Sequence, residues 1–199
     1  MKEIGKFKLW ELALLLALCV SSLTGLWAQR TQEELCSQMV RLHVLAVDDS
    51  RPEQRIKLQV RDAVLEYLAP ELQCARTAGE ARQIIGSRLD RIRLHAAMAA
   101  GGRPVQVTLS EEYYPTRDYE GFSLPAGKYQ SLRVILGEGR GHNWWCVVYP
   151  QLCLPAVSER EALSALSPDT VHLITDTEEV QYKFRILELW GRLQEWMEA

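Results

Sequence analysis

The chain has 199 residues, of which 47% are hydrophobic and 25% are charged, and its formal net charge is −3. This composition excludes a disordered chain, a fibrous repeat and a protein with several membrane spans. It also disfavours a nucleic-acid binder, because neutralising phosphates requires clustered Lys and Arg. One domain of ordinary size is therefore expected, with an appendage at most.

Residues 1–28 have the pattern of an export signal. Three lysines precede an apolar stretch from Leu12 to Val20, and Ala28 offers a cleavage point. The strictly apolar stretch is shorter than the roughly 20 residues that a stable membrane span needs. The alternative is an uncleaved anchor through residues 9–28, and either reading places the rest of the chain outside the cytoplasm. We expect residues 29–39 to form a linker or a short helix, and residues 40–199 to form a single domain.

Export brings the cysteines into an oxidising environment, where disulfides form and persist. Apart from Cys19 in the export segment, four cysteines remain, and four cysteines allow three pairings. We predict a disulfide between Cys146 and Cys153, because this pair closes a short loop that contains a proline. A second bridge between Cys36 and Cys74 is an open alternative.

Two sharper interpretations compete for Cys146. With His142 and Cys153 it makes three possible zinc ligands, but the spacing matches no standard zinc finger and a fourth ligand is not evident. Cys146 is also a conceivable nucleophile with His142 as its base. Its place beside two tryptophans and before Val-Val-Tyr is more typical of a packed strand position, which favours a structural disulfide.

The first half of the exported part predicts one strand and two amphipathic helices. Apolar alternation from Val40 to Val47 indicates a strand that is apolar enough on both faces to be central. A Ser-x-x-Glu capping box at Ser50–Glu53 starts the first helix, which Pro70 is expected to interrupt. A second capping box at Thr77–Glu80 starts the next helix, and Gly101–Gly102 ends it.

The middle of the chain predicts an antiparallel meander. Apolar residues alternate from Val105 onward, and Tyr129–Leu136 and Trp144–Tyr149 have the pattern of two further strands. Turns are expected at Tyr113–Thr116 and Gly137–Gly141. The three glycines of the second turn do not predict a phosphate loop, because aromatic and β-branched residues follow them instead of a helix.

The C-terminal part predicts a helix over Ser158–Leu166, strands over Val171–Ile174 and Val180–Ile186, and a final helix from Leu187. All these elements together predict an α+β fold. It consists of an antiparallel-rich sheet packed against two amphipathic helices, with a C-terminal helix.

Several motifs in the domain are specific enough to indicate a family. In chain order they are Leu42–Ala46 followed by Asp49-Ser50, then Lys57–Val64, Gly137–Gly139, and Asn143–Pro150 with Cys153. With them the chain resembles the stage II sporulation protein R family of endospore-forming bacteria over Val40–Leu154, and more weakly at Lys183–Trp190. The family commonly has Asn-Ser-Asp-Ser after the first strand, whereas Val47 and Asp48 stand in its first two places here.

The resemblance implies a signalling protein and not an enzyme. Members are made in the forespore and exported into the space between the forespore and the mother cell. There they activate a membrane aspartic peptidase of the mother cell, which removes the pro-sequence of sigma factor E. The resemblance implies no cofactor, metal, nucleic acid or small-molecule substrate.

Two other classes of function stay open. An exported cell-wall hydrolase needs paired carboxylates, and Glu111-Glu112 and Asp118–Glu120 contain carboxylates that are more typical of solvated loops. A wall- or peptide-binding module would use the Trp and Tyr side chains as stacking platforms.

Partner contact is expected at a few residues within the shared motifs. Trp is enriched where proteins bind each other, and neighbouring strand residues point to opposite faces, so Trp144 is expected outward and Trp145 inward. The plainer interpretations are a surface ion pair for Arg61 and Asp62, and a hydrogen-bonded strand residue for His43. Asp48 and Asp49 are more typical of turn and cap residues. The candidate contact residues are Asn143, Trp144, Trp145, Tyr149, Arg61, Asp62, His43 and Asp49.

Overall fold

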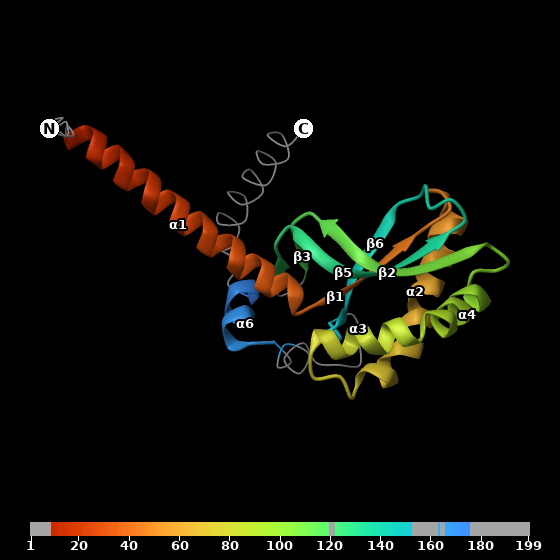
Figure 1. The fold of residues 1–199 in the computed structure, drawn as a ribbon. Helices are drawn as coiled ribbons and strands as arrows, with labels where there is room; N and C mark the ends of the chain where they lie inside the picture. The colour runs from red at the N-terminus through yellow and green to blue at the C-terminus, as the bar shows by residue number, and fades with distance from the viewer. Residues whose placement is uncertain (1–8, 120–121, 153–162, 164–165, 176–199) are drawn as a thin grey trace, which may run out of the picture.

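The computed structural model describes residues 9–119, 122–152, 163 and 166–175 (Figure 1). The helices in these ranges are α1 (Leu9–Ser37), α2 (Arg51–Leu72), α3 (Ala78–Ser87), α4 (Leu89–Ala99) and α6 (Pro168–Thr175). The strands are β1 (Val40–Leu45), β2 (Val105–Tyr114), β3 (Arg117–Tyr119), β4 (Phe122–Leu124), β5 (Gly127–Leu136) and β6 (Asn143–Tyr149).

Four strands form one sheet in the order β2-β5-β1-β6, and β3 pairs with β4 in a small separate sheet. β1 runs parallel to β5 and antiparallel to β6, while β2 and β5 are antiparallel. The predicted α+β class with a mostly antiparallel sheet is confirmed. The predicted meander is wrong, because β1 lies between β5 and β6. β1 is buried along nearly its whole length, which suits a central strand.

Helices α2, α3 and α4 cover one face of the four-stranded sheet (Figure 1). The predicted second helix is divided into α3 and α4 at Arg88, whose backbone leaves the helical region. The Arg88 Nε atom donates to Glu71 Oε2 of α2 at 2.6 Å, which holds this break against the neighbouring helix. Pro70 does not interrupt α2, which continues for two more residues.

The two predicted capping boxes have different outcomes. The Thr77 hydroxyl accepts a hydrogen bond from the Glu80 N–H at 3.2 Å, so the cap of α3 is confirmed. The Ser50 side chain makes no capping hydrogen bond, and Glu53 binds Arg103 instead. A tertiary ion pair has therefore replaced the local capping hydrogen bonds at the start of α2.

Apolar side chains form two clusters on opposite faces of the sheet, because neighbouring strand residues alternate between the faces. The first cluster lies between the sheet and α2, α3 and α4, and includes Leu42, Val44, Val60, Leu132 and Val148. The second lies on the other face and includes Leu35, Met39, Tyr114, Tyr129 and Val147.

The predicted strand near the C-terminus is wrong. Val171–Ile174 belongs to α6 and not to a strand. Ser167 precedes Pro168, and the Ser167 Oγ atom accepts a hydrogen bond from the Thr170 N–H at 3.3 Å, an arrangement that starts a helix. The predicted strand Val180–Ile186, the final helix from Leu187 and most of the predicted helix Ser158–Leu166 lie outside the described residues.

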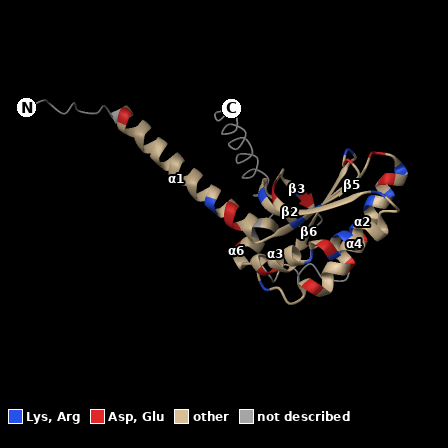
Figure 2. Cartoon of the chain, turned by 45° about the vertical axis from the view of Figure 1, so that its right-hand side comes forward, with Lys and Arg blue, Asp and Glu red and all other residues tan. Residues whose placement is uncertain are grey.

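Helix α1 projects away from the sheet (Figure 1) and carries no charged residue between Glu11 and Arg30 (Figure 2). It is long and apolar enough to cross a membrane, a property that signal sequences near an N-terminus share. The helix continues through Ala28, and Leu35 and Cys36 near its end are buried in the second cluster. Residues 29–37 are thus helical and are not an extended linker.

Candidate functional site

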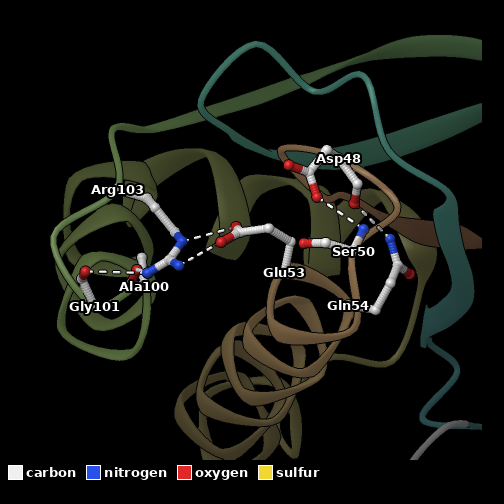
Figure 3. Close-up of polar contacts among 7 residues, drawn as sticks. All are labelled: Asp48, Ser50, Glu53, Gln54, Ala100, Gly101 and Arg103. Carbon is white, nitrogen blue, oxygen red and sulfur yellow. Dashed lines mark hydrogen bonds and ion pairs between the residues drawn. The ribbon is translucent and has the colours of Figure 1, made fainter.

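A bidentate ion pair fixes the start of α2 against the end of α4 (Figure 3). Arg103 Nε donates to Glu53 Oε2 at 2.7 Å, and the Arg103 Nη2 atom pairs with the second carboxylate oxygen. Arg103 Nη1 also donates to the carbonyl oxygens of Ala100 at 3.2 Å and Gly101 at 3.1 Å. Hydrogen bonding to the guanidinium lowers the pKa of Glu53. The first turn of α2 is therefore held by tertiary contacts.

The turn between β1 and α2 is closed by Asp48, as Figure 3 also shows. Asp48 Oδ1 accepts from the Ser50 N–H at 2.8 Å, and the Asp48 carbonyl accepts from Gln54 Nε2 at 2.9 Å. The hydrogen bond to Ser50 lowers the pKa of the Asp48 carboxyl group. The predicted turn role of this aspartate is confirmed.

The connection from β5 to β6 is fastened to this same turn. Asp49 Oδ1 accepts from the His142 N–H at 2.6 Å and also pairs with the His142 ring, and these bonds lower the pKa of Asp49. Lys57 Nζ donates to Gln54 Oε1 at 2.6 Å and to the His142 carbonyl at 3.0 Å. Because His142 precedes β6, these contacts position the first residues of that strand beside α2.

Trp144 lies at the surface against α2, and its side chain is 37% exposed. The Arg61 guanidinium lies over the Trp144 ring, 4.4 Å from the ring centroid, and Arg61 Nη2 pairs with Asp62 Oδ1 at 2.7 Å. Asn143 and Asp62 are exposed beside this stack. Five of the eight candidate contact residues thus lie around the first half of α2 and the start of β6. We call Asp49, Arg61, Asp62, Asn143 and Trp144 the α2–β6 surface.

The other three candidate residues lie elsewhere. Trp145 is half-buried on the opposite face of the sheet, so the expected orientations of the two tryptophans are confirmed. Tyr149 is 3% exposed and His43 is 5% exposed. Their burial is incompatible with the expected direct partner contact, because both side chains pack inside the domain. The strand pattern did not separate these buried residues from the exposed ones.

His43 is a hydrogen-bonded strand residue, as its plainer interpretation predicts, but the sequence did not predict its partners. His43 Nδ1 lies 2.9 Å from Glu112 Oε1, and the Ser131 hydroxyl donates to Glu112 Oε2 at 2.8 Å. The Tyr114 and Ser131 hydroxyl groups are 2.6 Å apart. Burial works to raise the pKa of Glu112, but the bonds from Ser131 and His43 outweigh it and hold that pKa below its usual range. Glu112 is therefore a structural carboxylate on β2, where a solvated loop residue was expected.

Glu112→Gln is expected to lower the free energy of unfolding near pH 7 by about 1–2 kcal/mol, because charge-assisted hydrogen bonds are lost. The depressed pKa means that Glu112 contributes stability above its unfolded pKa of about 4.3, and that this stability disappears as the pH falls through the folded value. Denaturant unfolding at pH 7 and pH 3.5 measures the effect. The difference between wild type and variant should shrink at the lower pH, and an equal difference at both would contradict the assignment.

The structure bears on both disulfides that the sequence suggested. Cys146 is disulfide-bonded and buried at 1% exposure, which removes it as a nucleophile, but Cys153 lies outside the described residues. The Cys146–Cys153 pairing therefore stays a prediction. Cys36 and Cys74 are both free thiols, so the open alternative of a bridge between them is wrong. Within the described residues no group of three or more His, Cys, Asp or Glu side chains is arranged to hold a metal ion.

Replacing Cys146 and Cys153 together with serine is expected to lower the free energy of unfolding by about 2.5 kcal/mol, the chain-entropy value for so short a loop. Thermal unfolding of residues 29–199 under oxidising conditions measures this loss. A reducing agent should destabilise the wild type and leave the variant unchanged. Equal stability of the two proteins without reductant would refute the pairing.

Comparisons with known proteins match the part of the chain that carries these motifs. The sequence profile described as stage II sporulation protein R matches residues 36–159. The curated stage II sporulation protein R of Bacillus subtilis (strain 168) is 31% identical over 162 residues, which cover 75% of this chain and 72% of the relative. No solved structure matches the chain. The matched region contains β1, α2, the glycine connection and β6, and the chain belongs to the stage II sporulation protein R family.

Proposed function

We propose that this sporulation protein is exported from the forespore and activates a membrane aspartic peptidase of the mother cell, which then cleaves pro-sigma-E. Family membership supports this function, since it places the chain among sporulation proteins. The apolar helix α1, preceded by three lysines, suits export into the space between the two compartments.

The α2–β6 surface is the proposed contact with the peptidase. It brings together an exposed tryptophan, an arginine and two carboxylates from α2, β6 and the turn before α2. Trp and Arg are the residue types that most often dominate binding energy at protein interfaces. Arg61 already covers one face of the Trp144 ring, which favours a protein contact over a platform for stacking sugars.

Activation requires only binding in this mechanism. A protein that binds the active conformation of the peptidase more tightly than the inactive one shifts the equilibrium by that difference in affinity. The rigid frame around Glu53, Arg103 and Asp49 keeps the surface in one arrangement before contact, which reduces the entropic cost of docking.

The end of α1 would hold the domain close to the forespore membrane if residues 9–28 are not cleaved off. Residues 29–37 continue the helix into the domain core, and at 1.5 Å per residue they span roughly 14 Å. The domain would then stand close to the forespore membrane and face the peptidase in the opposing mother-cell membrane. Cleavage after Ala28 would leave this helical segment attached to the domain and release it into the intermembrane space.

Reconstitution in one host tests the proposed function. The full chain with its export segment, the membrane peptidase and pro-sigma-E are expressed together, and cleavage of the precursor is followed on immunoblots. Cleavage should require both the chain and an intact catalytic aspartate in the peptidase. Absence of cleavage despite verified export would refute the proposal, and so would cleavage that persists when the peptidase is inactivated.

A further inference from the structure

A groove of about 650 Å³ lies beside the α2–β6 surface, between the first turns of α2 and the start of β6. Leu58 and Trp144 contribute its apolar part. The groove is lined by Asp49, Arg51, Gln54, Arg55, Lys57, Leu58 and Trp144.

The charges around this groove are unbalanced. Three cations, Arg51, Arg55 and Lys57, line it with only one carboxylate. That carboxylate belongs to Asp49 and is already bonded to His142. Arg51 and Arg55 are exposed, and neither forms an ion pair with any other described residue. The groove therefore presents positive charge that the described part of the chain does not neutralise.

Lys57 makes this imbalance more pronounced. Its side chain is 5% exposed, and its ammonium group donates to two neutral oxygens, Gln54 Oε1 and the His142 carbonyl. No carboxylate among the described residues lies within ion-pair distance of it. Burying a charge whose hydrogen-bond partners are neutral is costly. The negative charge of Asp49 offsets only part of that cost, and an anion at the groove would offset more of it. The positive end of the α2 dipole adds to the same potential.

We propose that this groove binds an acidic segment of the membrane peptidase, with carboxylates against Arg51, Arg55 and Lys57 and an apolar side chain against Leu58 and Trp144. The inference rests on the proposed function and names the chemistry of the partner segment. A protein segment fits better than an anionic membrane surface, because the site is concave and because Asp49 at its edge would repel a dense layer of phosphates.

The test compares the charge-reversed variant Arg51→Glu/Arg55→Glu with the matched control Arg82→Glu, an exposed arginine of α3. The full chain and the peptidase are purified in a nonionic detergent, and their affinity is measured by fluorescence anisotropy at low and high NaCl. We expect the double variant to bind at least about tenfold more weakly at low salt, because like charges would face each other. The control should bind as the wild type does.

Ionic strength gives a second readout that a folding defect would not mimic. Salt should weaken wild-type binding, because it screens attraction between exposed charges, and this dependence should be smaller in the neutral variant Arg51→Gln/Arg55→Gln. Both variants change exposed residues, and thermal unfolding checks that the fold is kept. Wild-type affinity in the charge-reversed variant, or wild-type binding that salt does not affect, would overturn the inference.

Two further outcomes separate this inference from its alternatives. Binding of the wild type to phosphatidylglycerol vesicles without peptidase, lost in the charge-reversed variant, would identify a lipid surface as the ligand and overturn the peptide assignment. Failure of the wild type to bind the peptidase would overturn the proposed function as well. If the wild type activates cleavage normally and the charge-reversed variant binds the peptidase as tightly as the wild type, only the assignment of the groove is overturned.

Discussion

Trp144→Ala is expected to reduce cleavage of pro-sigma-E by at least about 30-fold in the reconstituted host, the effect of losing about 2 kcal/mol at an interface hot spot. Trp144 is the exposed aromatic side chain of the α2–β6 surface, and Arg61 holds its ring in place from one side. Removing the ring takes away its contact area and leaves the arginine without its stacking partner. Immunoblots of the precursor and the mature sigma factor measure the reduction.

Tyr113→Ala is the matched control for this variant. Tyr113 is 54% exposed on β2, the strand at the opposite edge of the sheet from β6. Its loss should leave cleavage near the wild-type rate. Export and thermal unfolding of both variants are measured in parallel, so that a folding defect is recognised. Full cleavage by a well-folded Trp144→Ala protein would exclude Trp144 as a contact.

Gly141→Ala is expected to lower the free energy of unfolding by about 3 kcal/mol or more, at the upper end of what overpacking costs. A Cβ atom at this position would lie 2.3 Å from the Asp48 carbonyl oxygen and 2.9 Å from the Ala46 Cβ atom. The blocking oxygen belongs to backbone and cannot rotate away. The Gly141 N–H also donates to the Ala46 carbonyl at 3.0 Å, so the connection cannot move outward without losing that bond.

The same substitution should impair activation beyond its effect on stability, because Gly141 precedes the residues that orient Trp144. Gly86→Ala is the control: its Cβ would meet only Leu109 at an ordinary 3.7 Å, within helix α3. Alanine there should stabilise the protein by about 0.5–1 kcal/mol, because glycine is unfavourable within a helix. Denaturant unfolding measures both changes. A neutral Gly141→Ala variant would show that the close approach to Asp48 is not required.

Local signals predicted the helix boundaries well where short-range bonds decide them. Thr77 caps α3, and Gly101 and Gly102 end α4 with positive φ angles of 57° and 83°. At Ser50 the same kind of motif failed, because Glu53 has a better partner in Arg103, fifty residues away. A capping box predicts a bond between near neighbours and carries no information about a distant guanidinium that competes for the same carboxylate.

The sequence offered the residues of the α2–β6 surface as candidates, but it did not predict how they are arranged. The family motifs drew attention to Trp144, Arg61 and Asp49, and strand alternation placed Trp144 outward. Periodicity could not indicate that Arg61 would cover the Trp144 ring, since residues of α2 and β6 meet only after β6 pairs with β1. It also assigned Glu112 to a loop, whereas pairing of β2 with β5 brings it beside Ser131 and His43.

The amino-acid sequence alone determined the apolar N-terminal segment, the α+β class, the family and the two faces of the central strand, because each depends on composition, periodicity or local motifs. Tertiary structure alone decided the strand order, the burial of Tyr149 and His43, and the cationic groove beside Trp144. Hydrophobic alternation specifies which face of a strand is buried and leaves its neighbours undetermined. Those neighbours are chosen by packing and charge pairing between segments far apart in the chain.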